Sequence, residues 1–153
     1  MPRTRRSRTI AAPAEELWAL IGDPHHLPRW WPRVERVEDV VGGAFTEVMR
    51  TKSGRIVRAD FSIVRRDERE RALSWEQRLA GTPFERVLSS AETEVRLAPC
   101  GAETGDAAQA TDVTIELRQR MTGFFPRFGG FMVRRASGAI LDEALDSLER
   151  ISG

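Results

Sequence analysis

Hydrophobic and polar residues alternate with a period of two over most of the chain between residues 33 and 122. Such alternation is typical of antiparallel strands that bury one face and leave the other in solvent. Turn signals at Gly42-Gly43, at Ser53-Gly54 and in the segment 80–83 separate the runs. The pattern predicts an early strand at 4–11, with its arginines facing solvent, and six more at 33–41, 44–52, 55–66, 71–80, 84–99 and 111–121.

Two short helices are predicted between the first and second strands. Pro13 suits the first turn of a helix, and Gly22 ends it. Its apolar stripe includes Trp18, which we expect in the core. Asp23 then caps a second helix that runs to Pro32. In this second helix Leu27, Trp30 and Trp31 are spaced to face inward together.

The end of the chain has a different period. From about Phe128, apolar residues recur every three to four positions as far as Ile151. A helix of roughly 20 residues spans about 30 Å, enough to lie along the concave face of a twisted sheet. We therefore expect an α+β fold, with a curved antiparallel sheet of about seven strands wrapped around a long C-terminal helix.

The element order and one local signature resemble a known superfamily. The stretch "APAEELW" followed by "DPHHLPRW" fits the pattern A-P-x-E-x-x-W and D-P-x-x-L-P-x-W. This resembles the helix-grip fold of the START and Bet v 1-like superfamily (SRPBCC), in particular its bacterial polyketide cyclase/dehydrase and lipid-transport branch. The resemblance covers essentially the whole chain. It implies an apolar cavity between the sheet and the C-terminal helix, with Trp30 and Trp31 at its gate.

Composition narrows the class of protein. A chain of 153 residues fits one domain, 1–153, and a net charge of +1 disfavours a dedicated nucleic-acid binder. A single cysteine, Cys100, excludes an internal disulfide. No apolar run approaches a membrane span, and no secretory signal follows the basic N-terminus. We expect a cytoplasmic protein, and the excess of arginine over lysine is typical of a GC-rich bacterial genome.

Motifs for metal, cofactor or triad chemistry are not recognisable. The only histidines, His25 and His26, are adjacent, so on a helix they point about 100° apart and are poorly placed to ligate one metal. A serine triad would need a histidine opposite a serine, and a phosphate loop would need a lysine-bearing glycine loop. We therefore expect neither a metal nor a cofactor.

The inward rows predict the lining of a ligand pocket. Polar residues interrupt these rows at Gln77, Gln119, Ser89 and Thr93, and Arg135 falls near the helix stripe. A ligand, a water molecule or another protein group would have to satisfy each of them. The predicted lining residues are Trp31, Phe61, Trp75, Gln77, Ser89, Leu117, Gln119, Met121, Phe131, Met132 and Arg135.

Two functions fit such a pocket. The first is binding of an apolar small molecule, such as a lipid, an isoprenoid or a polyketide-like compound, by a monomer or homodimer without a nucleic-acid partner. The alternative is a cofactor-free polyketide cyclase/dehydrase that positions a poly-ketone and polarises its carbonyls. Candidates for the polar catalytic groups are Arg135, Gln77 and Gln119, with Asp60 or Glu76 if the strand register shifts by one. We favour binding, and the catalytic residues stay unassigned.

Overall fold

The computed structural model describes residues 3–100, 110–122 and 129–152, and the side chains of the last helix from residue 135 onward. The elements in chain order are β1 (Arg3–Ile10), α1 (Ala14–Ile21), the 3₁₀ turn η1 (Pro24–His26), α2 (Leu27–Trp30), β2 (Val34–Val41), β3 (Ala44–Arg50), β4 (Ile56–Asp67), β5 (Ala72–Gln77), the 3₁₀ turn η2 (Pro83–Arg86), β6 (Leu88–Cys100), β7 (Ala110–Met121) and α3 (Gly129–Ser152). No helix within these ranges is long and apolar enough to cross a membrane.

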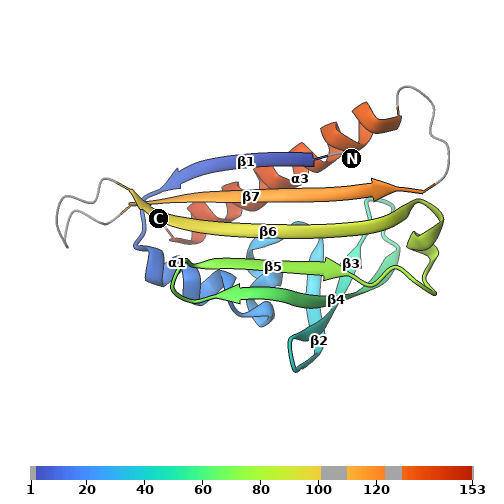
Figure 1. The fold of residues 1–153 in the computed structure, drawn as a ribbon, viewed down its shortest axis with the longest axis horizontal. Coiled ribbons are helices and arrows are strands. Elements are labelled where there is room, and N and C mark those ends of the chain that lie inside the picture. Colours follow the sequence, from blue (N-terminus) through green and yellow to red (C-terminus); the bar gives the residue numbers. More distant parts are fainter. Residues whose placement is uncertain (1–2, 101–109, 123–128, 153) are drawn as a thin grey trace.

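The seven strands form one sheet in the order β1-β7-β6-β5-β4-β3-β2, and every neighbouring pair is antiparallel (Figure 1). The chain therefore runs as a meander from β2 to β7, and β1 adds to the far edge beside β7. Gly42 and Gly43 make the β2–β3 hairpin turn with φ of 56° and 83°, values that a glycine adopts without strain. The predicted α+β fold, with a curved seven-stranded sheet and a long C-terminal helix, is confirmed.

One predicted strand begins later than the alternation indicated. Residues 84–86 were predicted as strand, but Pro83 to Arg86 form the 3₁₀ turn η2, and β6 starts at Leu88. Pro83 lies at the start of this turn, where its missing N–H is harmless. The Glu85 carboxylate accepts a hydrogen bond from the backbone N–H of Gly81 at 2.7 Å and so closes the turn. The local capping geometry thus overrides the period-2 pattern.

The two short helices form where capping signals predicted them. The backbone N–H of Gly22 donates to the Trp18 carbonyl at 2.7 Å, and a Cβ at Gly22 would lie 2.8 Å from that oxygen, so only glycine fits. Asp23 then caps the next segment by accepting from the backbone N–H of His25 at 3.0 Å. The first turn of that segment is 3₁₀ rather than α-helical.

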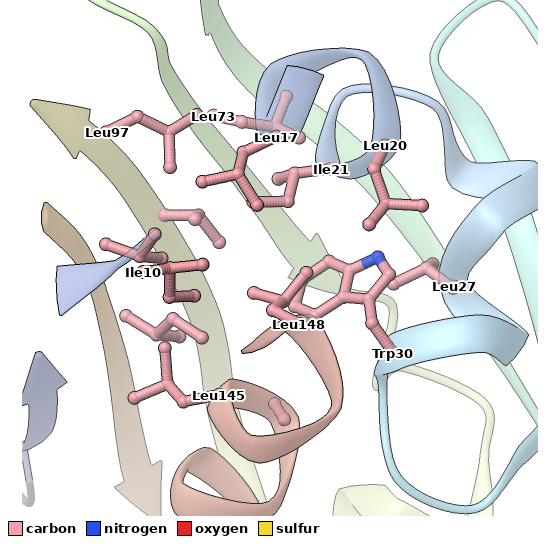
Figure 2. Close-up of a cluster of buried hydrophobic side chains, with 14 of the residues drawn as sticks. Ile10, Leu17, Leu20, Ile21, Leu27, Trp30, Leu73, Leu97, Leu145 and Leu148 are labelled. Atoms are coloured by element: carbon pink, nitrogen blue, oxygen red, sulfur yellow. The ribbon is translucent and has the colours of Figure 1, made fainter. Parts of the chain in front are cut away.

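The core lies between the sheet, α1, α2 and the second half of α3, on the face that we call the inner face (Figure 2). Trp30 is 1% exposed there, packed among leucine and isoleucine side chains from all these elements. Trp18 is only half-buried, and its Nε1 donates to Glu68 at 2.6 Å. The prediction that Trp18 is the core tryptophan of α1 is therefore wrong. Leu17 and Ile21 take the inner stripe, and Trp18 lies about 100° around the helix from Leu17.

The long helix α3 packs mainly on the edge strand β1 (Figure 1). Arg6 forms an ion pair with Asp142 at 3.4 Å, and Arg8 forms one with Asp146. A Cβ at Gly138 would overlap the Arg6 guanidinium, so this glycine gives the arginine room on the helix. Arg6 is exposed, as predicted for the arginines of this strand, whereas Arg8 is half-buried, and the ion pairs of both join the sheet edge to the helix.

Candidate functional site

An aromatic cluster gathers on the inner face, where the end of α2 meets β3, β4 and β5. Its five members are Trp30, Trp31, Phe45, Phe61 and Trp75. Trp31 meets Trp30 and Trp75 edge-to-face at 5.4 and 5.8 Å between ring centroids, and Phe45 stacks on Phe61 at 5.4 Å. Such pairs contribute about 0.5–1.5 kcal/mol beyond simple burial, so the cluster is a firm wall.

The exposure of the side chains in the cluster increases from a buried base to a half-buried rim. Trp30, Phe45 and Trp75 are at most 3% exposed, whereas Trp31 and Phe61 are half-buried. Trp31 is the first residue after α2, where the backbone becomes extended. Trp75 therefore belongs to the base of the wall, and Trp31 and Phe61 form its rim.

The strand register continues this wall across the sheet. Trp75 pairs with Thr93, which pairs with Leu117, so the three lie in one row on the inner face. Phe61 pairs with Gln77 in the next row, where Ala91 pairs with Gln119. Leu117, Met121 and both glutamines are half-buried.

One of the polar candidates has a protein partner. The Gln119 Oε1 accepts a hydrogen bond from the Ser137 hydroxyl at 3.2 Å, and Ser137 is 4% exposed on α3. Sequence reasoning placed Arg135 near this stripe, but Arg135 is exposed and Ser137 takes the inward position two residues later. The phase of the helix, and not its residue types, decides which polar group meets the sheet.

The remaining predicted residues do not join this group. Ser89 is exposed, and its hydroxyl donates to the Arg120 carbonyl at 3.3 Å, beside an irregularity in the β6–β7 register. The side chains of Phe131 and Met132 lie outside the part that the structure describes. The wall described here therefore comes from the sheet and α2, with Ser137 as its contact from α3.

Glu47 is a functional candidate that the sequence analysis missed. It lies on β3 between Phe45 and Met49 on the inner face, opposite Ala59 of β4 and Val37 of β2. The side chain is 2% exposed, and within the described ranges it makes no hydrogen bond or ion pair. Burial raises the pKa of the Glu47 carboxyl group to about 8. At neutral pH this group is a neutral carboxylic acid in an apolar setting.

Residues 1–153 match the model of a family described as polyketide cyclase/dehydrase and lipid transport. The chain belongs to this family. No curated protein sequence matches it.

Solved structures of similar fold support the same architecture. A START superfamily protein from Mycobacterium smegmatis superposes with a TM-score of 0.77 at 14% identity, over 99% of this chain and 97% of that chain. The di-domain ARO/CYC protein BexL from the BE-7585A biosynthetic pathway gives 0.78 at 22% identity, over 98% of this chain but 46% of that chain. A protein from Thermus thermophilus, TTHA0849, gives 0.69 at 22% identity, over 97% of this chain and 95% of that chain. These likenesses show the helix-grip fold of the family.

In this member of the polyketide cyclase/dehydrase and lipid transport family, the pockets that the described residues line include surface pockets of about 260, 250 and 350 Å³. One of about 260 Å³ opens where the pairing of β5 with β6 ends, and it brings Gln77 and Ser89 together. The others lie between α1 and the end of α3, and among arginines on the outer face of the sheet. The expected cavity between the helix and the sheet stays a prediction.

His25 of this family member takes part in helix capping. The Asp23 Oδ1 lies 2.8 Å from the Nδ1 of His25, and His25 is exposed. Burial raises the pKa of Asp23, but the backbone and side-chain hydrogen bonds from His25 outweigh it and hold the pKa below its ordinary value. Among the described residues, no group of three or more histidine, cysteine, aspartate or glutamate side chains could hold a metal ion.

Proposed function

We propose that this protein binds an apolar small molecule, such as a lipid, an isoprenoid or a polyketide-like compound, against the aromatic wall of its inner face. The observation that carries the proposal is the half-buried rim of Trp31 and Phe61, held by fully buried aromatic rings beneath it. Partly exposed rings on a rigid base offer a ligand apolar area at little cost in side-chain ordering. A cytoplasmic location and a monomeric or homodimeric state belong to the same proposal.

The rows of the sheet extend the proposed contact surface. Leu117 and Met121 continue the apolar rim onto β7, while Gln77 and Gln119 add a few polar groups. A mostly apolar surface with a small number of polar groups is what small-molecule sites present. This composition favours a ligand with an extended apolar body and only occasional oxygen atoms.

Native mass spectrometry of freshly purified protein, followed by solvent extraction, identifies any compound that copurifies. Calorimetric titration with naphthalene-sized apolar probes then compares Trp31→Ala with Trp18→Ala. These two tryptophans form a matched pair, because both are half-buried against the core while only Trp31 belongs to the aromatic wall. We expect Trp31→Ala to weaken probe binding about tenfold or more, the loss of roughly 1.4 kcal/mol of contact, and Trp18→Ala to leave it unchanged.

Two outcomes would contradict the proposal. Equal loss of binding in both variants would mean that the effect comes from general destabilisation. Equal affinity in both variants and the parent chain would show that Trp31 is not part of the binding surface.

A second candidate function is cofactor-free cyclisation and dehydration of a poly-ketone. It is favoured by the fold likeness to BexL, which is described as an ARO/CYC protein, and by the amide groups on the inner face. In such a reaction, hydrogen-bond donors stabilise the enolate oxygen as charge develops on it. Gln77 pairs directly with Phe61 of the rim, and Gln119 pairs with Ala91 further along the same row.

Product profiling with a poly-ketone substrate separates the two functions. For a cyclase, Gln77→Leu or Gln119→Leu should lower the rate of cyclised product about 10²–10³-fold, with little change in probe binding. For a carrier, Gln77→Leu should keep or improve probe binding, since replacing an amide by an apolar group removes a desolvation cost. Gln119→Leu should do so only together with Ser137→Ala, because the single change leaves the buried Ser137 hydroxyl without its acceptor. Lost product with unchanged probe binding would make the cyclase the better description.

A further inference from the structure

Among the described residues, the inner face carries an acidic side chain that takes part in no helix cap and no ion pair. Glu47 is 2% exposed on β3, and within the described ranges its carboxyl group has no hydrogen-bond partner. Its neighbours on the inner face are apolar, namely Val37, Phe45, Met49 and Ala59. A polar group in such a place costs free energy unless something satisfies it.

The charged residues of the same strands lie elsewhere. Arg36 and Arg58 both pair with Glu38 on the outer face, and Thr46 donates to Asp60 there. None of them is an inner-face neighbour of Glu47 in the strand register, since adjacent strand positions point to opposite faces. The sheet itself therefore separates Glu47 from the guanidinium groups of Arg36 and Arg58.

The position of Glu47 relative to the aromatic wall is fixed by the register. It lies two residues along β3 from Phe45, a separation of about 7 Å, and Phe45 stacks on Phe61 at the rim. The cross-strand neighbour on β4 is Ala59, the smallest side chain on the inner row of that strand. A ligand that lies against Phe61 would therefore have Glu47 within reach of a substituent on its ring system.

We propose that Glu47, as a neutral carboxylic acid, donates a hydrogen bond to a ketone carbonyl of the apolar molecule bound at this face. This inference rests on the proposed binding function and narrows its ligand to neutral carbonyl compounds. A ketone has an acceptor and no donor, so it complements an acid O–H in an otherwise apolar setting. A pure hydrocarbon would leave the acid unsatisfied.

Equilibrium dialysis with two probes of matched shape tests the inference, namely 2-acetylnaphthalene and 2-ethylnaphthalene. The parent chain should bind the ketone about tenfold more tightly than the hydrocarbon, the value of one net hydrogen bond. Glu47→Leu should abolish or reverse this preference. Glu47→Gln should keep most of it, because the amide N–H can donate in the same direction. Val64→Ala, on an exposed position of β4, is the control variant and should leave both affinities unchanged.

The infrared spectrum of the bound ketone gives a readout that does not depend on variants. In the parent chain at about pH 6, the carbonyl stretch should lie at a lower frequency than in a hydrocarbon solvent. At about pH 9.5, where the Glu47 carboxyl group is ionised, the ketone preference should disappear. In Glu47→Gln it should persist at both pH values.

The outcomes separate this inference from the function on which it rests. If the parent chain binds neither probe, the proposed binding function fails and the inference fails with it. If the parent chain and Glu47→Leu bind both probes equally well, the binding function stands and the role of Glu47 is overturned. An unshifted carbonyl stretch in the bound ketone would also overturn it.

Discussion

At the scale of single residues, Glu47 shows what the sequence alone left undecided. The alternation of β3 places Phe45, Glu47 and Met49 on one face, so the pattern already contains the position of the acid. The residue type favoured a place in solvent, because glutamate is rarely buried without a partner. By contrast, Phe61 and Trp75 were predicted on the inner face because type and period agree. Arg135 and Ser137 differ only by helix phase, which apolar spacing fixes poorly near the start of a helix.

The buried acid makes the stability of the fold depend on pH in a definite direction. Glu47 has an ordinary pKa of 4.5 in the unfolded chain and about 8 in the folded one. The folded state therefore binds the extra proton between these values, and the free energy of unfolding falls as the pH rises through this window. At about pH 9 the parent chain should have lost on the order of 4 kcal/mol relative to about pH 5 through this group.

Urea unfolding of the parent chain and Glu47→Gln checks this prediction. The amide cannot ionise, so the difference in unfolding free energy between the two proteins should shift in favour of the variant as the pH rises. Parallel curves for the two proteins between about pH 5 and about pH 9 would show that the acid is not buried as described.

At the scale of elements, the helices and strands were largely predictable because capping residues and periodicity agree. The turn at Pro83 was missed because the alternation of the following residues continued through it. The docking of α3 on β1 was also missed, since it depends on Arg6, Arg8 and their partners across more than a hundred residues. Contacts of that kind follow from tertiary packing and leave no local signal in the sequence.

The contact between Gly138 and Arg6 predicts a background-dependent substitution. In the parent chain, Gly138→Ala should change the unfolding free energy by no more than about 0.5 kcal/mol. The gain in helix propensity is about 1 kcal/mol, and displacing the Arg6 guanidinium from Asp142 offsets it. In an Arg6→Ala background the same change should stabilise the protein by about 1 kcal/mol.

Thermal and urea unfolding of the four proteins in this cycle measure the coupling between the two positions. An identical effect of Gly138→Ala in both backgrounds would show that the arginine does not lie on this glycine.

At the scale of the whole molecule, the architecture could be predicted from the sequence, but the location of the buried core within it could not. The single sheet, its antiparallel order and the terminal helix follow from the order of periodic segments. Figure 1 shows α3 running along β1 and β7 at one side of the sheet, while α1 lies near the other strands. The buried core includes side chains of α1, α2 and residues 141–148 of α3 together with the sheet. The half-buried rim of Trp31 and Phe61 packs against this core.

The aromatic cluster also gives the protein a built-in optical reporter. The chain has four tryptophans and no tyrosine, so its near-ultraviolet emission arises from tryptophan. Trp30, Trp31 and Trp75 lie 5.4 to 6.5 Å apart between ring centroids, close enough to share excitation energy. A quencher or an absorbing ligand in contact with the half-buried Trp31 would therefore lower the fluorescence of all three tryptophans together. Trp18→Phe would remove the fourth emitter and leave a signal that comes from the wall of the proposed site.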